Sequence, residues 1–122
     1  MAELFRSPGY DLLTPEDRQM LLNGCGPKGA VVDLVPDSIL GVSIREACNI
    51  HDYDYSQGKT WKDKKYADKR FLQNMGIIIS AKENQWKWTR KLRMAIARKY
   101  YEAVRDFGGD AYCVGKPELM EI

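Results

Sequence analysis

Two predicted helices place ionisable side chains on the same face as their apolar residues, and this feature constrains the fold more than any other. One helix, expected from about Ser43 to Tyr55, has an inward stripe at helical spacing that consists of Ile44, Ala47, Cys48, His51, Asp52 and Tyr55. A second helix begins after Thr60, and its stripe consists of Asp68, Phe71, Leu72 and Met75. Because a buried carboxylate is costly unless it is paired or hydrogen-bonded, Asp68 needs a polar partner on a facing helix.

His51, the only histidine in the chain, is the natural partner for Asp68. A carboxylate that accepts a hydrogen bond from one ring nitrogen fixes the tautomer and leaves the other nitrogen as a base. Tyr55 lies one turn after His51 and is placed to donate its hydroxyl to the same carboxylate. The pattern predicts a base, an orienting carboxylate and a supporting hydroxyl. The alternative, a histidine that is simply packed in the core, stays open.

Capping residues mark where the helices begin. The stretch Thr14–Asp17 combines a capping threonine, a proline and two acidic residues, and it predicts a short helix that runs to about Leu22. The stretches Ser43–Glu46 and Thr60–Asp63 both have the pattern of a capping box. These signals favour a chain of successive helices with few strands.

The composition is that of one soluble globular domain, with 122 residues of which 44% are hydrophobic and 30% charged. It excludes a disordered tail, a collagen-like chain and a membrane-spanning protein. We expect a mostly α single domain over residues 1–122, with its core in residues 14–80 and a basic C-terminal helix at about residues 84–107. No secretory signal is visible, so a cytoplasmic location is the default expectation.

Basic residues are concentrated in one block of a chain whose formal net charge is +2. Residues 58–105 contain 14 basic and four acidic side chains. The basic C-terminal helix begins with tryptophans among cations, namely Trp86, Lys87, Trp88, Arg90 and Lys91. This combination is typical of contact with an anionic membrane interface.

The same basic helix has two other interpretations. Its stripe at helical spacing is Trp88, Leu92, Ile96, Tyr100, Ala103 and Phe107, which favours a packed helix with Trp88 in the core. A basic helix with aromatic residues also suits nucleic acid, but no named nucleic-acid-binding motif is present. Nucleic acid is therefore the least favoured partner.

A glycine-rich loop at residues 24–29 offers exposed backbone carbonyl groups. Asp52 follows His51 directly, but consecutive helical side chains diverge by about 100°, so Asp52 needs a role of its own. One carboxylate with several loop carbonyls and water is the ligand set of Ca²⁺. One histidine and three scattered cysteines do not form a zinc spacing. An ordinary turn and a solvent-exposed Asp52 remain the alternative.

These motifs together resemble the phospholipase A2 superfamily. Two blocks carry the resemblance, the loop Gly24-Cys25-Gly26-Pro27-Lys28-Gly29 and the helix Ala47-Cys48-Asn49-Ile50-His51-Asp52-Tyr53-Asp54-Tyr55. The stretch Tyr66–Leu72 is similar to the second long helix of that family, which supplies an aspartate. The spacing is most similar to the short phospholipase domain of parvovirus capsid proteins, and about residues 22–75 are covered. The resemblance implies two long antiparallel helices that carry His51 and Asp68, with an N-terminal calcium loop.

The family likeness also implies an activity and a role for each matching residue. The activity is calcium-dependent hydrolysis of the sn-2 ester of glycerophospholipids in a bilayer. His51 would be the general base, Asp68 would orient it and Tyr55 would support Asp68. The implied Ca²⁺ ligands are the carboxylate of Asp52 and the backbone carbonyls of Gly24, Gly26 and Lys28, with the Gly26 N–H assisting at the oxyanion. Many members have glycine where this chain has Lys28.

The same family resemblance leads to expectations for the cysteines and for the location of the protein. Cys25 and Cys48 match a family disulfide that ties the calcium loop to the catalytic helix, whereas in a reducing compartment they would stay thiols. Cys113 has no evident partner and is expected to be a small buried residue. Because the resemblance is to a viral capsid domain, association with a virion is expected as an alternative to a cytoplasmic location. It also leaves two other functions open, a non-catalytic protein of the same fold and a basic nucleic-acid-binding helical protein.

Overall fold

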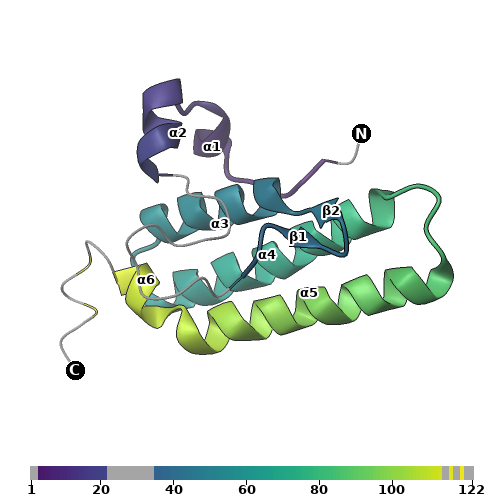
Figure 1. Ribbon diagram of the computed structural model, residues 1–122. Helices are drawn as coiled ribbons and strands as arrows, with labels where there is room; N and C mark the ends of the chain where they lie inside the picture. Colours follow the sequence, from purple (N-terminus) through teal and green to yellow (C-terminus); the bar gives the residue numbers. More distant parts are fainter. Residues whose placement is uncertain (1–2, 22–34, 114–115, 117–118, 120–122) are drawn as a thin grey trace.

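Three long helices lie side by side in the computed structural model, which describes residues 3–21, 35–113, 116 and 119 (Figure 1). Helix α3 spans Arg45–Gln57, α4 spans Trp61–Ala81 and α5 spans Lys87–Phe107. Helix α4 runs antiparallel to α3, and α5 runs antiparallel to α4. Helix α4 packs against both of the others. The expectation of a small, mostly α domain is confirmed.

Short elements surround the three long helices. Two short helices, α1 at Pro8–Asp11 and α2 at Pro15–Leu21, precede α3, and α6 at Gly109–Cys113 follows α5. Strands β1 (Ser38–Ile39) and β2 (Val42–Ser43) form a two-stranded antiparallel hairpin that precedes α3 in the chain. Its two turn residues have positive φ angles, 46° at Leu40 and 81° at Gly41, as the right-handed twist of a two-residue hairpin requires.

The expected capping box at the start of α4 is present. The backbone N–H of Asp63 donates to Oγ1 of Thr60 at 3.1 Å, and the carboxylate of Asp63 accepts from the backbone N–H of Thr60 at 3.2 Å. At the start of α2, Thr14 likewise accepts from the N–H of Asp17 at 3.1 Å. These bonds satisfy donors that the first turn of a helix leaves without partners.

The expected capping box at Ser43–Glu46 is wrong. The residue before α3 is Ile44, and its side chain makes no capping hydrogen bond. Ser43 instead belongs to β2, where it pairs with Ser38. The carboxylate of Glu46 accepts a hydrogen bond from the hydroxyl of Tyr10. The Oγ of Ser43 accepts from the N–H of Arg45 at 3.4 Å, so a local bond is present at this helix but the reciprocal capping box is not.

The main core lies where α4 contacts its two neighbours. Its buried members come from the β hairpin region and from all three long helices, and they are Val35, Ile39, Ile44, Ala47, Cys48, Phe71, Met75, Ile79, Ala97 and Val104. The stripes predicted for α3 and α4 agree with this arrangement, apart from Asp52 and Leu72, which are partly exposed. The helix-period pattern thus identified the inward faces of α3 and α4.

The predicted inward stripe of α5 is wrong in part. Ile96 and Tyr100 do pack against the core, but Trp88 is 66% exposed and Phe107 is 72% exposed. The buried residues lie one position later along the helix, at Arg93, Ala97 and Val104. Arg93 is tolerated inside because its guanidinium donates to a side-chain oxygen of Gln85 and to the carbonyl of Leu40, both at 2.8 Å. The helix also begins at Lys87 instead of residue 84.

The N-terminal arm is fastened to α4 through Asn74. The side chain of Asn74 is fully buried, accepts from the N–H of Phe5 at 2.7 Å and donates to the carbonyl of Phe5 at 2.9 Å. Arg70 on the same helix donates to Ser7 at 3.0 Å and pairs with Asp54 of α3 at 3.3 Å. The arm, α3 and α4 therefore hold one another in register around the middle of the molecule.

Candidate active site

His51 and Asp68 meet in the interface between α3 and α4. The Nε2 atom of His51 lies 2.7 Å from Oδ1 of Asp68, and the two side chains are only 8% and 2% exposed. The contact that the helical stripes predict is therefore present. Within the described residues, Nδ1 of His51 makes no hydrogen bond. The catalytic role of each residue stays a prediction.

Aromatic rings hold the imidazole of His51 in its plane. The ring of Phe71 stacks on it with centroids 4.7 Å apart and an interplanar angle of 28°. The ring of Tyr55 lies on it at 4.2 Å with a tilt of 48°. Because both neighbours are buried, the imidazole has little freedom to turn away from Asp68.

Tyr55 supports the pair, as the sequence predicts. Its hydroxyl donates to Oδ1 of Asp68 at 2.7 Å, so this oxygen receives hydrogen bonds from two residues. Burial of the phenol, followed by the nearby negative charge of Asp68, raises the pKa of Tyr55 far above its ordinary value. The hydroxyl therefore stays protonated and acts as a donor to the carboxylate.

Asp68 is ionised although it is buried. Burial opposes ionisation and is the largest single influence on this group, but hydrogen bonds from His51, Lys64 and Tyr55 together outweigh it and lower the pKa of Asp68 below its ordinary value. An ionised carboxylate only accepts hydrogen bonds. The proton shared with the imidazole therefore belongs to Nε2, and the lone pair is left on Nδ1.

Lys64 is a member of this site that the sequence analysis missed. It is only 6% exposed, and its ammonium group lies 2.8 Å from Oδ2 of Asp68. The other lysines of α4, at positions 62, 65 and 69, are exposed. The available signal was the spacing, since Lys64 lies four residues before Asp68 and side chains at that separation are neighbours on a helix.

Gly108 leaves the room that Tyr55 occupies. A Cβ atom at this position would lie 2.8 Å from the Tyr55 hydroxyl and 2.5 Å from the carbonyl oxygen of Val104. Gly108 is the C-cap residue of α5. Its φ of −86° is open to any residue, so the glycine is required here for space.

The predicted calcium ligands are only partly within the described chain. Asp52 follows His51 on α3 and is half-buried. Gly24, Gly26 and Lys28, including the Gly26 N–H expected at the oxyanion, lie outside the described residues. Across the described ranges, no group of three or more His, Cys, Asp or Glu side chains is placed to hold a metal ion. Of the predicted Ca²⁺ ligands, the described part of the chain contains the carboxylate of Asp52.

The cysteines differ in state. Cys48 is buried on α3 and is disulfide-bonded. Its expected partner, Cys25, lies outside the described residues. Cys113 on α6 is a buried free cysteine, in line with its expected place in the interior.

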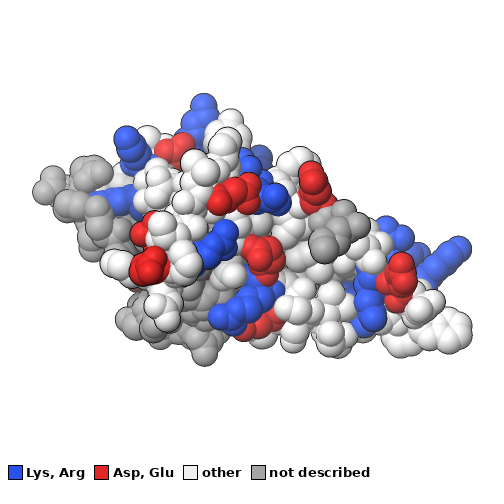
Figure 2. Space-filling model, turned by 90° about the horizontal axis from the view of Figure 1, so that it is seen from above, with Lys and Arg blue, Asp and Glu red and all other residues white. Residues whose placement is uncertain are grey.

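The residues predicted to contact a bilayer lie at the connection between α4 and α5, away from the His51–Asp68 pair. All five are exposed, and they are Trp86, Lys87, Trp88, Arg90 and Lys91. Figure 2 shows Lys and Arg atoms at the end of the molecule that carries this connection, as well as elsewhere on the same face. None of the helices in the described part of the chain is both long enough and apolar enough to cross a membrane.

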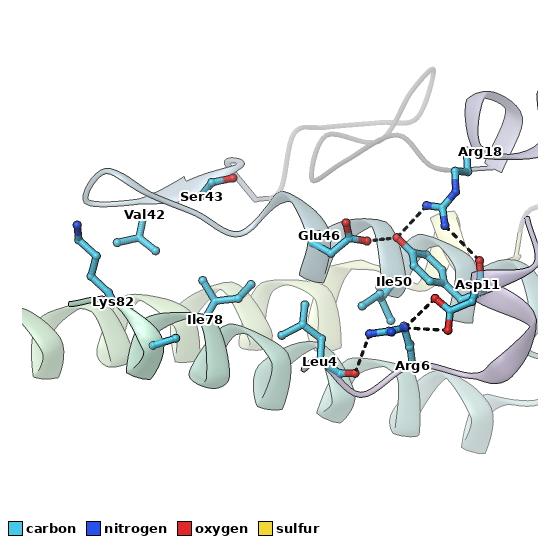
Figure 3. Close-up of a pocket in the computed structure, with 12 residues that line it drawn as sticks. Leu4, Arg6, Asp11, Arg18, Val42, Ser43, Glu46, Ile50, Ile78 and Lys82 are labelled. Atoms are coloured by element: carbon cyan, nitrogen blue, oxygen red, sulfur yellow. Dashed lines mark hydrogen bonds and ion pairs between the residues drawn. The ribbon is translucent and has the colours of Figure 1, made fainter. Parts of the chain in front are cut away.

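A pocket of about 610 Å³ lies on another face of α3 (Figure 3). Ile50 of α3 and Ile78 of α4 line it, together with the ion pair of Arg6 and Asp11, whose atoms are 2.9 Å apart. His51 does not line it, because successive side chains of a helix diverge by about 100°. The pocket is therefore separate from the candidate base.

No family model matches the chain, and neither does any curated protein or any solved structure. The relationship to the phospholipase A2 superfamily consequently stays a prediction from the motifs. A functional conclusion must depend on the chemistry of His51, Asp68, Tyr55 and Lys64.

Proposed function

We propose that this chain hydrolyses the sn-2 ester of glycerophospholipids in a calcium-dependent reaction, with His51 as the general base. The observation that carries the proposal is the buried hydrogen bond between Nε2 of His51 and Oδ1 of Asp68. It leaves the Nδ1 lone pair to accept a proton, as a general base requires. A packed histidine without such a role needs neither an ionised partner nor the two further donors that surround Asp68.

The proposed reaction needs no covalent intermediate with the enzyme. Nδ1 of His51 takes a proton from a water molecule while the water oxygen attacks the carbonyl carbon of the ester. The charge that forms on the imidazole is stabilised by the carboxylate of Asp68. When the tetrahedral intermediate collapses, the imidazolium returns the proton to the leaving alkoxide oxygen. The products are a fatty acid and a lysophospholipid.

The calcium dependence is proposed because the chain offers oxygen atoms suited to bind Ca²⁺. Asp52 would contribute a carboxylate, and the backbone carbonyls of Gly24, Gly26 and Lys28 would complete a shell of oxygen ligands of the kind that Ca²⁺ prefers. Asp52 is only half-buried, which suits a carboxylate that receives a ligand. Bound Ca²⁺ supplies positive charge next to the oxyanion of the substrate, where the Gly26 N–H also acts.

The proposed substrate lies in a bilayer, and the exposed end of the α4–α5 connection supports that choice of partner. Trp86 and Trp88 are 73% and 66% exposed and lie among three cations. Exposed indole rings beside Lys and Arg are suited to the headgroup region of an anionic membrane. Large exposed aromatic side chains otherwise cost solubility.

A vesicle assay tests the function. Mixed vesicles of phosphatidylcholine and phosphatidylglycerol are incubated with the protein in the presence of Ca²⁺ or of a chelator, and the fatty acid released from the sn-2 position is measured. We expect release that requires Ca²⁺, and we expect His51→Gln to abolish it. Gln57→Ala, an exposed change on the same helix, is the matched control and keeps the wild-type rate.

Three outcomes would contradict the proposal. Release by His51→Gln at the wild-type rate would exclude His51 as the base. Absence of release by folded wild-type protein, with retained binding to the vesicles, would favour a non-catalytic membrane-binding protein. A salt-dependent complex with random-sequence DNA, without lipid turnover, would favour a nucleic-acid-binding protein instead.

A further inference from the structure

Lys64 is a buried cation whose three donor positions are all occupied. Its ammonium group donates to Oδ2 of Asp68 at 2.8 Å, to the carbonyl of Val104 at 3.0 Å and to the carbonyl of Arg105 at 3.2 Å. An ammonium group has three N–H donors and no acceptor. The side chain is therefore fully satisfied at 6% exposure, and its position is determined by three contacts.

The two carbonyls belong to the last turn of α5. Carbonyl groups there form the negative end of the helix dipole, and that of Val104 also accepts from the N–H of Gly108 at 2.9 Å. Lys64 therefore lies between the carboxylate of Asp68 on its own helix and the negative end of a second helix. It links the site formed by α3 and α4 to α5, which contributes no side chain to the His51–Asp68 pair.

The oxygens of Asp68 are divided between two sets of donors. Oδ1 accepts from Nε2 of His51 and from the hydroxyl of Tyr55, whereas Oδ2 accepts from Lys64. Rotation of the carboxylate would break bonds on both sides. The bond to Lys64 thus helps to hold the plane of the carboxylate in the orientation that faces the imidazole.

We propose that Lys64 is a positioning residue that, through its bond to Oδ2, holds the carboxylate of Asp68 turned towards His51, so that the ring proton stays on Nε2 and the lone pair stays on Nδ1. For its effect on turnover the inference rests on the proposed function, but the tautomer of His51 belongs to the resting protein. Without the ammonium, burial, which raises the pKa of Asp68, would be opposed by the hydrogen bonds from His51 and Tyr55 alone. A protonated carboxyl can donate as well as accept, so it would no longer dictate which nitrogen of the imidazole carries the proton.

Other groups around the carboxylate do not replace this cation. The polar side chains that face it from α3 are His51 and Tyr55, and Tyr112 of α6 packs on the ring of Tyr55 with centroids 5.0 Å apart. Within the described residues, Lys64 is the one cation that bonds to Asp68. Its removal therefore leaves the carboxylate without a charged partner.

The test uses the single histidine of the chain as a spectroscopic probe. Protein with ¹⁵N-labelled histidine gives one pair of ring nitrogen signals, whose chemical shifts distinguish a protonated from an unprotonated nitrogen. Spectra are recorded at one mildly alkaline pH for the wild type, for Lys64→Met and for Lys65→Met. Lys65 is the matched control, because it is the exposed neighbour of Lys64 and carries the same charge.

We expect the wild type and Lys65→Met to show the tautomer with the proton on Nε2, and Lys64→Met to show a mixture of both tautomers. In the vesicle assay we expect Lys64→Met to lower kcat by about 10- to 100-fold, as removal of an outer partner of an oriented histidine typically does, with little change in KM. A spectrum and a kcat of Lys64→Met that both equal those of Lys65→Met would overturn the proposal.

A second variant covers the case in which Lys64→Met does not fold. Lys64→Arg keeps a cation that can donate to Asp68 and to the carbonyls of α5, and we expect it to keep the Nε2-protonated form. In wild-type protein with ¹⁵N-labelled lysine, the ammonium protons of Lys64 should exchange slowly with water, unlike those of Lys65. A mixture of tautomers in Lys64→Arg, or a fast-exchanging Lys64 ammonium, would overturn the assignment.

The two readouts separate this inference from the proposed function. If the wild type fails to hydrolyse phospholipid but its tautomer depends on Lys64, the proposed function falls and the positioning role stands. If the wild type hydrolyses phospholipid and its tautomer is the same without Lys64, the positioning role falls and the function stands.

Discussion

Lys64 and Asp68 form a buried ion pair one helical turn apart, with Nζ of the lysine 2.8 Å from Oδ2 of the aspartate. Both side chains are less than a tenth exposed. A buried pair of this kind contributes little net stability, because desolvation of the two charges offsets their attraction. Removal of one partner alone is costly, since it leaves the other charge buried and unpaired.

The free energies of unfolding of single and double variants should reveal the energetic coupling between Lys64 and Asp68. We expect Lys64→Met to lower the free energy of unfolding by about 3–5 kcal/mol, and the double variant Lys64→Met/Asp68→Asn to recover much of that loss because neither charge remains. Urea unfolding followed by circular dichroism measures both. Lys65→Met should stay within about 0.5 kcal/mol of the wild type. Equal losses in the single and the double variant would speak against the coupling.

Acid should destabilise the protein through Asp68. The pKa of Asp68 in the folded chain lies below its ordinary value of 3.8. Its contribution to stability is therefore fully present above that value and is lost as the pH falls through the lower folded value. Asp68→Asn should flatten this part of the profile of urea midpoint against pH. A profile parallel to that of the wild type throughout the acid range would contradict the assignment.

Gly108 should tolerate no side chain. Gly108→Ala places a Cβ atom 2.8 Å from the Tyr55 hydroxyl and 2.5 Å from the carbonyl of Val104. Overpacking of this kind costs about 1–3 kcal/mol, and displacement of Tyr55 should also reduce lipid hydrolysis. Gly109→Ala is the control, because its Cβ would meet only Trp61 at an ordinary 3.8 Å. Equal unfolding midpoints for the two variants would refute the packing argument.

Asn74 should determine whether the N-terminal arm stays attached. Asn74→Ala removes both hydrogen bonds to the backbone of Phe5 and leaves those groups without their partner. A cost of about 1–3 kcal/mol is expected for such a buried loss. Limited proteolysis should cleave the arm faster in this variant than in Gln73→Ala, which changes the exposed neighbour. Unchanged cleavage of the arm would show that other contacts hold it.

Trp88 should contribute to membrane binding through its position near the α4–α5 connection. Burial of a large apolar side chain in the interface is worth about 1.5–3 kcal/mol, so Trp88→Ala should weaken binding to anionic vesicles by about tenfold or more. Cosedimentation with vesicles measures the affinity of each variant for the membrane. The control is Phe107→Ala, since Phe107 is similarly exposed at the opposite end of α5. Equal weakening by both changes would exclude a specific contact at Trp88.

Much of the site was predictable because His51, Tyr55 and Asp68 lie on regular helix faces. His51 and Tyr55 are one turn apart on α3, and Asp68 shares its face with the buried Phe71 and Met75 on α4. The need to pair a buried carboxylate then brings the two helices together. The faces of α5 were harder, since apolar residues occur on both sides of it and Arg93 is buried through bonds to Gln85 and Leu40.

The sequence by itself determined that His51 and Tyr55 of α3 and Asp68, Phe71 and Met75 of α4 turn inward, because the spacing of three to four residues is a local property of the helix. It also determined the start of α4, since Thr60 and Asp63 cap each other within one turn. Only the tertiary structure decided the place of Lys64, whose bond to the carbonyl of Val104 joins residues 40 positions apart. Such a contact depends on where α5 ends against α4, and local periodicity carries no information about that distance.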